Sequence, residues 1–175
     1  MSDVKYTWNE YIELNEELVY KVAKSGWDFD CLLCLSRGGM RPGDFFSRVY
    51  NKPLGILATS SYREAKGTVQ SELDISDCIT GLNDLKGRVL LVDDMVDSGK
   101  TISEVIAHLK SRYPAITEIR VAVLWWKAHS VLTPDWHCVF FDDNPWIHQP
   151  FECYDDLGKD TLIAQFEAKH GKDGE

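Results

Sequence analysis

Residues 89–101 run Val-Leu-Leu-Val-Asp-Asp-Met-Val-Asp-Ser-Gly-Lys-Thr, and they constrain the fold more than any other part of the 175-residue chain. The apolar run before Asp93 is typical of a parallel strand covered on both faces, and the strand is expected to stop at Asp93. Gly99 lets the backbone turn so that successive amides can face an anion. A helix that opens at Thr101 adds a dipole that favours negative charge. The stretch therefore predicts a strand, a phosphate-binding loop at residues 97–101, and a helix.

Spacing separates the kinds of protein that share parts of this stretch. A Walker P-loop needs a glycine five residues before the Gly-Lys-Thr, where this chain has Asp94. A receiver domain also ends a strand with paired aspartates, but near the start of a shorter domain and without the Ser-Gly-Lys-Thr that follows. An ordinary turn rich in Asp, Ser and Gly is a further alternative. Paired acids directly after a buried strand weigh against that turn.

The thirteen residues match the signature of the type I phosphoribosyltransferases, which has four hydrophobic residues, two acids, two variable residues, an acid, Ser or Thr, Gly, any residue and Thr. The chain resembles this family. The resemblance implies that Asp93 and Asp94 contact the ribose hydroxyls of phosphoribosyl pyrophosphate (PRPP). Carboxylates are acceptors for vicinal hydroxyls, and a loop of amides and hydroxyls suits a dianion. The residues expected at the 5′-phosphate are Asp97, Ser98, Gly99, Lys100 and Thr101.

Strands alternate with helices along the chain, which predicts an α/β fold with a doubly wound, mainly parallel sheet and ligands outside the carboxyl ends of its strands. The resemblance implies the phosphoribosyltransferase kind of this fold, with a small hood formed by C-terminal segments. Helices are predicted at residues 7–24, 42–50, 102–112 and 161–169. Strands are predicted at residues 29–35, 54–59, 69–78, 88–92, 118–126 and 137–141, with a mobile loop at 60–68 and irregular structure at 142–156.

Size and charge bound the function. Residues 1–175 are expected to form a single domain, with a core at about 28–127 and a base-binding hood at about 128–156, since 44% hydrophobic content suffices for one buried core. Lys and Arg total 19 against 28 Asp and Glu, and a net charge of -9 would repel nucleic acid. The N-terminus has no apolar signal core, and no apolar run approaches the roughly 20 residues of a membrane helix. A soluble, cytoplasmic protein without a membrane span is expected.

Cysteine and histidine spacing gives little sign of a redox or transition-metal site. The five cysteines are an odd number in a chain without a signal peptide, so a disulfide framework is not expected. Cys31 and Cys34 have redox or zinc spacing, but residues three apart in a strand point to opposite faces, and both are expected to pack in the core. The five histidines show no pair at helical ligand spacing.

The sequence Ser36-Arg37-Gly38-Gly39 is expected on the same rim of the sheet as Asp93, because it follows the first core strand. Paired glycines allow close backbone approach to a ligand, and Arg37 adds a permanent cation. Alone, the motif is more typical of an ordinary glycine turn. Its place before the acid pair is that of the pyrophosphate loop in the family, so the resemblance implies that Ser36 to Gly39 bind pyrophosphate.

Ser61 and Tyr62 resemble the Ser-Tyr pair in the lid of the purine-salvage branch, where a lid would exclude water while a cationic sugar centre forms. An ordinary exposed loop is the alternative. Lys127 ends a predicted strand, and in 6-oxopurine enzymes a lysine at this place donates to the 6-oxo group. A later aromatic residue stacks on the base, which implies Trp146, and the backbone carbonyl of Ile147 is expected to read the 2-position.

Two segments are especially close to bacterial xanthine-guanine phosphoribosyltransferases, residues 36–43 and residues 146–152. The resemblance covers about residues 30–156. His148 occupies a position that is usually acidic, and Glu152 replaces the aspartate that helps bind magnesium. Because Glu152 keeps the charge, it is the predicted ligand of Mg²⁺.

The resemblance implies Mg-dependent transfer of the 5-phosphoribosyl group from PRPP to N9 of guanine, xanthine or hypoxanthine in purine salvage, with release of pyrophosphate. Asp97 is the candidate for proton exchange at purine N7; a loop-capping aspartate is the alternative. The family usually forms dimers or tetramers, so a homodimer or homotetramer is expected. Two other functions stay open, namely a phosphoribosyltransferase for a different base and a non-catalytic regulator that senses PRPP or a nucleotide.

Overall fold

The protein is described by a computed structural model that covers residues 3–61 and 73–171, without the side chains of residues 60, 61 and 73. The chain forms two compact units. The larger unit is Ile12–Asn144, and the smaller unit combines Met1–Tyr11 with Pro145–Glu175. The single domain therefore stays a prediction. Residues 128–144 of the predicted hood belong to the larger unit, and residues 145–156 belong to the smaller unit.

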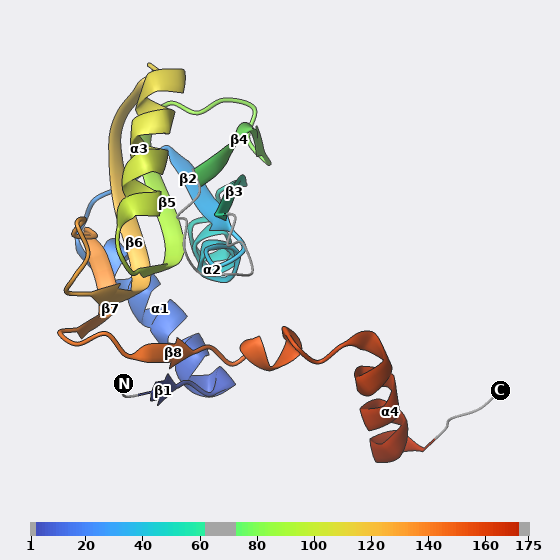
Figure 1. Cartoon of the computed structure of the whole chain (residues 1–175). Helices are drawn as coiled ribbons and strands as arrows, with labels where there is room; N and C mark the ends of the chain where they lie inside the picture. The colour runs from blue at the N-terminus through green and yellow to red at the C-terminus, as the bar shows by residue number, and fades with distance from the viewer. Residues whose placement is uncertain (1–2, 62–72, 172–175) are drawn as a thin grey trace. The chain divides into compact units, whose positions relative to one another are not determined.

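The larger unit contains a six-stranded sheet in the order β4-β3-β2-β5-β6-β7 (Figure 1). All neighbouring strands run parallel except β3 and β4, which are antiparallel. The strands are β2 (Cys31–Ser36), β3 (Leu54–Ser61), β4 (Leu73–Thr80), β5 (Gly87–Val96), β6 (Ile116–Lys127) and β7 (Trp136–Phe141). The helices are α1 (Trp8–Lys24), which begins in the smaller unit, α2 (Met40–Tyr50) and α3 (Lys100–Arg112). The predicted α/β fold with a mainly parallel sheet is confirmed.

Helices cover both faces of this sheet. Ile102, Val105 and Leu109 of α3 are buried in one core with Leu91 and Val123 of the sheet. On the opposite face, α2 lies so close to β2 that a Cβ atom on Gly43 would be 3.0 Å from the Cβ atom of Cys34. Continuous apolar strands follow from this arrangement, because each central strand is buried on its two faces.

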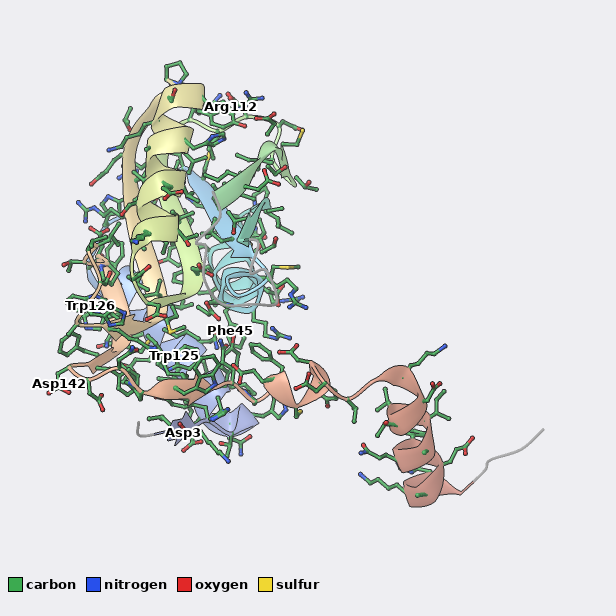
Figure 2. All side chains as sticks on the ribbon, in the orientation of Figure 1. Asp3, Phe45, Arg112, Trp125, Trp126 and Asp142 are labelled. Atoms are coloured by element: carbon green, nitrogen blue, oxygen red, sulfur yellow. The ribbon has the colours of Figure 1, made fainter. Side chains whose placement is uncertain are left out.

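The two tryptophans near the end of β6 show the alternation of the strand (Figure 2). Trp125 is fully buried, whereas Trp126 is partly buried and packs against the core beneath α3. Successive residues of a strand point to opposite faces, so the pair contributes to both cores.

The sequence predicted that this strand ends at Asp93. In the structure β5 continues to Val96. Its pairing with β2 ends at Val92, opposite Cys34, although β2 itself continues to Ser36. Its pairing with the longer β6 goes on to the partners Val96 and Trp126. Asp93 and Asp94 therefore lie in a part of β5 that is paired on one side only.

The smaller unit holds a two-stranded parallel sheet that was not predicted. The strand β1 (Asp3–Lys5) pairs with β8 (Trp146–His148), inside the stretch expected to be irregular. Three-residue strands are too short to show an apolar alternation, and their partners lie far apart in sequence. A 3-10 helix follows at Glu152–Tyr154, and α4 spans Lys159–His170, near its predicted bounds.

Cys31 and Cys34 are buried in the core, as predicted, and all five cysteines are free thiols. Burial, followed by the negative charge of Asp93, raises the pKa of the Cys34 thiol to about 12. This thiol is therefore protonated and unreactive at neutral pH. In the described part of the chain, no helix has both the length and the apolar character needed to cross a membrane.

Candidate active site

The two acids of β5 lie against the loop Ser36–Gly39, called the glycine loop below. A Cβ atom at position 38 would lie 2.5 Å from a carboxylate oxygen of Asp94. A Cβ atom at position 39 would lie 2.3 Å from the carbonyl oxygen of Val92 and 3.0 Å from the Cα atom of Asp93. Real Cβ atoms do not approach other atoms this closely, so a side chain at position 39 would meet fixed backbone and one at position 38 would displace the Asp94 side chain. The predicted pyrophosphate loop and the predicted ribose acids thus form one continuous surface.

The glycine loop connects β2 directly to α2. Gly39 donates its amide hydrogen to the carbonyl oxygen of Leu35 at 2.9 Å, and Gly43 donates to the carbonyl oxygen of Gly39 at 2.8 Å. The peptide bond between Ser36 and Arg37 is cis. The side chain of Arg37 is exposed and pairs with no acid among the described residues. Its guanidinium group can therefore meet an anion from solvent.

The carboxylates of Asp93 and Asp94 are neighbours that repel each other when both are charged. The amide of Asp94 donates to Oδ1 of Asp93 at 2.9 Å. Burial, and then the negative charge of Asp94, raise the pKa of Asp93 well above its usual value. The protein by itself therefore favours a neutral carboxylic acid at Asp93. A cation, or hydroxyl donors on a ligand, would favour the carboxylate.

The predicted phosphate loop, residues 97–101, turns at Gly99 into α3. Gly99 has φ 77° and ψ -6°, in the left-handed region that favours glycine, and it is the residue before the first turn of the helix. Gly99 has no side chain to cap that turn, and the amide of Lys100 donates to Oγ of Ser98 at 3.4 Å. The first amides of a helix have no partner within it, so those of α3 can bind an anion at this end of the sheet.

The segment Ala128–Leu132, called the support segment below, follows β6 and packs on the phosphate loop. Val131 donates its amide hydrogen to the carbonyl oxygen of Ser98 at 2.9 Å. A Cβ atom on Gly99 would lie 2.4 Å from Oγ of Ser130. The support segment thus limits the conformations open to the phosphate loop.

Asp97 and Lys127 lie side by side at the ends of β5 and β6. The Nζ atom of Lys127 is 3.4 Å from Oδ1 of Asp97, and it donates to Oδ1 of Asn144 at 2.8 Å. Lys127 is 5% exposed, whereas the side chain of Asp97 is 52% exposed. The Nε2 atom of His129 is 3.0 Å from the same Oδ1 of Asp97. A buried cation and an accessible carboxylate therefore meet at the rim.

The remaining predicted site residues belong to the smaller unit. Trp146 is 56% exposed and Ile147 is buried on β8. The Nδ1 atom of His148 is 3.6 Å from Oε2 of Glu152, and its Nε2 atom is 3.3 Å from Oδ2 of Asp3. Trp146, His148 and Glu152 help to line a cavity of about 630 Å³. This unit on its own thus presents an aromatic face and a carboxylate to one cavity.

The predicted lid lies mostly outside what the structure describes. Ser61 ends β3, where it pairs with Leu73 of β4, and Tyr62 lies outside the described residues. The lid therefore stays a prediction.

Sequence reasoning did not foresee the roles of His129 and Asn144 around the Asp97–Lys127 pair. A signal was present, because His129 lies just beyond the carboxyl end of a predicted strand that neighbours β5. The parallel register places Val96 opposite Trp126, which brings the next residues, Asp97 and Lys127, to the same rim. Residues just past Lys127 then reach Asp97.

Comparisons with known proteins bear on the fold and the family of the chain. The family model of the phosphoribosyl transferase domain matches residues 6–156. The purine phosphoribosyltransferase from Pyrococcus horikoshii Ot3 is 31% identical, with a TM-score of 0.71, over 86% of this chain and 95% of that chain. The Helicobacter pylori xanthine-guanine-hypoxanthine phosphoribosyltransferase is 24% identical, with a TM-score of 0.71, over 87% and 97%. A hypothetical protein from Neisseria gonorrhoeae with bound ppGpp is 18% identical, with a TM-score of 0.64, over 98% of both chains.

Proposed function

Because the chain belongs to the family of proteins with a phosphoribosyl transferase domain, we propose that it transfers the 5-phosphoribosyl group of PRPP to N9 of a 6-oxopurine. Family membership makes the chain a transferase. The observation that carries the choice of base is the buried ammonium group of Lys127 beside the accessible carboxylate of Asp97. One group can donate to a 6-oxo oxygen while the other accepts a proton from the same ring. Guanine, xanthine and hypoxanthine all present a 6-oxo oxygen next to N7, which fits a role in purine salvage.

PRPP would bind along the rim of the larger unit. Its 5′-phosphate would accept hydrogen bonds from the amides of the phosphate loop and the start of α3, where the helix dipole favours a dianion. Its ribose hydroxyls would donate to Asp93 and Asp94. Its pyrophosphate would lie along the glycine loop, where the exposed Arg37 adds a positive charge. The close contact of the glycine loop with Asp94 supports binding of one ligand across both.

The donor set suits Mg²⁺ that is held mainly by the substrate. Mg²⁺ prefers oxygen ligands and usually binds one or two carboxylates together with substrate phosphates and water. Glu152 offers one half-buried carboxylate at the cavity of the smaller unit. Across the described ranges, no three His, Cys, Asp or Glu side chains are grouped as a metal cage. When bound, Mg²⁺ supplies counter-charge for the departing pyrophosphate.

The transfer breaks the bond between C1′ of the ribose and the pyrophosphate oxygen and forms a bond from C1′ to N9. Positive charge develops on the sugar as pyrophosphate leaves, and Arg37 would offset the negative charge on the leaving group. The base carries a proton on N7 that must be lost once N9 is bonded to carbon. Asp97 would accept that proton, since its carboxylate is exposed at the rim.

Selectivity would come from hydrogen bonds that a wrong base cannot make. Lys127 donates and cannot accept, so a 6-amino group would leave its ammonium poorly paired. Trp146 would stack on the purine ring, and the backbone carbonyl of Ile147 would read the 2-position. The exposure of Trp146 supports its availability to a ligand. We further expect the lid at Ser61 and Tyr62, a homodimer or homotetramer, and a cytoplasmic location.

The test is a pyrophosphate-release assay with PRPP, Mg²⁺ and a panel of guanine, xanthine, hypoxanthine, adenine, uracil and orotate. We expect release with at least one 6-oxopurine and little with adenine or the pyrimidines. Asp97→Asn should lose this activity while still binding PRPP. Preference for adenine or a pyrimidine would overturn the choice of base. Absence of release with every base, despite PRPP binding, would favour a regulator that senses PRPP.

A further inference from the structure

His129 is the nearest cationic or hydrogen-bonding side chain to Asp97 in the described part of the chain. Its Nε2 atom lies 3.0 Å from Oδ1 of Asp97, within hydrogen-bond distance, whereas Nζ of Lys127 is 3.4 Å from that oxygen. Lys127 makes its shorter contact with Asn144, at 2.8 Å. The histidine thus makes the shorter of these two contacts of Asp97, and the lysine lies between two oxygens, one of Asp97 and one of Asn144.

The backbone fixes where His129 stands. The support segment is joined to β6 by a hydrogen bond from the amide of Ser130 to the carbonyl oxygen of Lys127 at 3.1 Å. It is joined to β7 by a bond from the amide of Ala128 to the carbonyl oxygen of Phe141 at 2.8 Å. His129 lies between these two anchored residues. A residue on an anchored backbone can restrict a carboxylate that is itself half exposed on a loop.

We propose that His129 is a positioning residue that holds Oδ1 of Asp97, a role that rests on the proposed function. The contact of Nε2 with Oδ1 restricts the orientation of the carboxylate toward N7 of the base. The same contact limits the pull of Asp97 on Lys127, whose ammonium then remains able to donate to the 6-oxo group. Without His129, the Asp97 carboxylate could adopt several rotamers and move toward Lys127. The carboxylate and the Lys127 ammonium would then both be misplaced.

The size of the effect follows from the sensitivity of proton transfer to geometry. A misplacement of about 1 Å can lower a rate by about 100-fold. Because His129 contacts the side chain of Asp97 and not the loop amides that would bind the 5′-phosphate, its loss should lower kcat and leave the KM for PRPP within about twofold of wild type. A side chain that only supported the loop would instead raise that KM.

Four variants test this role in steady-state kinetics with the best 6-oxopurine. His129→Phe keeps a ring and removes the donor, and it should lower kcat by about 10- to 100-fold. His129→Gln keeps an N–H donor at similar reach, and its kcat should recover to within about threefold of wild type. His108→Phe, on α3, is the matched control and should behave as wild type. In the Asp97→Asn background, His129→Phe should not lower any residual single-turnover rate further, because the histidine acts through Asp97.

The results separate this inference from the proposed function. The inference would be overturned if His129→Phe kept the kcat of wild type. It would also be overturned if kcat in His129→Gln were as low as in His129→Phe. Either result would leave the proposed function intact. If wild type turns over no 6-oxopurine, the proposed function fails, and nitrogen NMR of the histidine rings decides whether the contact exists. Asp97→Asn should then shift the ring signals of His129 and leave those of His108 unchanged. Unchanged His129 signals would overturn the contact itself.

Discussion

Gly38 approaches the carboxylate of Asp94 so closely that a Cβ atom at position 38 would lie 2.5 Å from its Cγ atom. The obstacle at the next glycine is different, since a Cβ atom on Gly39 would meet the backbone oxygen of Val92 at 2.3 Å. A side chain can rotate away, but strand backbone cannot. The two glycines should therefore respond differently to the same substitution.

Gly38→Ala should displace the Asp94 side chain and raise the KM for PRPP by about tenfold or more, with a loss of stability under about 1 kcal/mol. Gly39→Ala should destabilise the protein by about 1–3 kcal/mol, because the sheet itself must move. Urea unfolding and PRPP kinetics on both variants measure the two effects. Equal stability losses in the two variants would contradict the assignment.

Asp93→Asn should stabilise the protein at neutral pH. Burial and the charge of Asp94 raise the pKa of Asp93 in the folded state, so the folded protein binds its proton more tightly than the unfolded chain. The contribution of Asp93 to stability is then present below its unfolded pKa and is lost as pH rises from there through the folded pKa. The measurement is the difference in unfolding free energy between variant and wild type from pH 4 to 8. It should grow as pH rises above the unfolded pKa, and a difference that shrinks with pH would refute the raised pKa.

Gly99→Ala and Gly26→Ala form a matched pair that tests the support segment. Both glycines have positive φ, 77° and 73°, so alanine costs about 1–2 kcal/mol at either position. Nothing lies within 4 Å of a Cβ atom at position 26, whereas Oγ of Ser130 would lie 2.4 Å from one at position 99. Gly99→Ala should therefore cost about 1–3 kcal/mol more in denaturant unfolding, and only this variant should raise the KM for PRPP. Equal losses of unfolding free energy in the two variants would mean that the support segment moves aside without cost.

Lys127→Met should lower kcat/KM for the 6-oxopurine by about 10- to 150-fold, the loss expected for a hydrogen bond from a charged donor. The KM for PRPP should change little, because Lys127 contacts the side chain of Asp97 and not the loop amides that would bind the 5′-phosphate. Lys110→Met, near the end of α3, is the control for removal of one lysine charge. Unchanged 6-oxopurine turnover in Lys127→Met would remove the reason for choosing a 6-oxopurine.

Glu152→Gln should increase the Mg²⁺ concentration for half-maximal activity by about tenfold or more if its carboxylate binds the ion directly or through water. A Mg²⁺ titration at saturating PRPP measures this, with Glu167→Gln on α4 as the control for charge. Excess chelator should abolish activity in all three proteins. Identical Mg²⁺ curves for Glu152→Gln and wild type would remove Glu152 from the metal site.

The sequence alone determined the parts of this protein that depend on local spacing. Apolar runs, glycines and acids within thirteen consecutive residues predict a strand, a turn and a helix, because the chemistry of each lies in the residues themselves. The same holds for the glycine loop, whose place after a core strand puts it on the ligand-binding rim. The family and the α/β sheet followed from these spacings.

Only the tertiary structure decided which side chains meet. Asp93 was expected to end a strand, but β6 extends far enough to keep β5 paired beyond it, and the length of a neighbouring strand is not written in the local pattern. The contact of His129 with Asp97 likewise depends on the register of two strands about thirty residues apart in the chain. Local propensity fixes the elements, whereas register and strand length, which arise from packing of the whole sheet, fix the site.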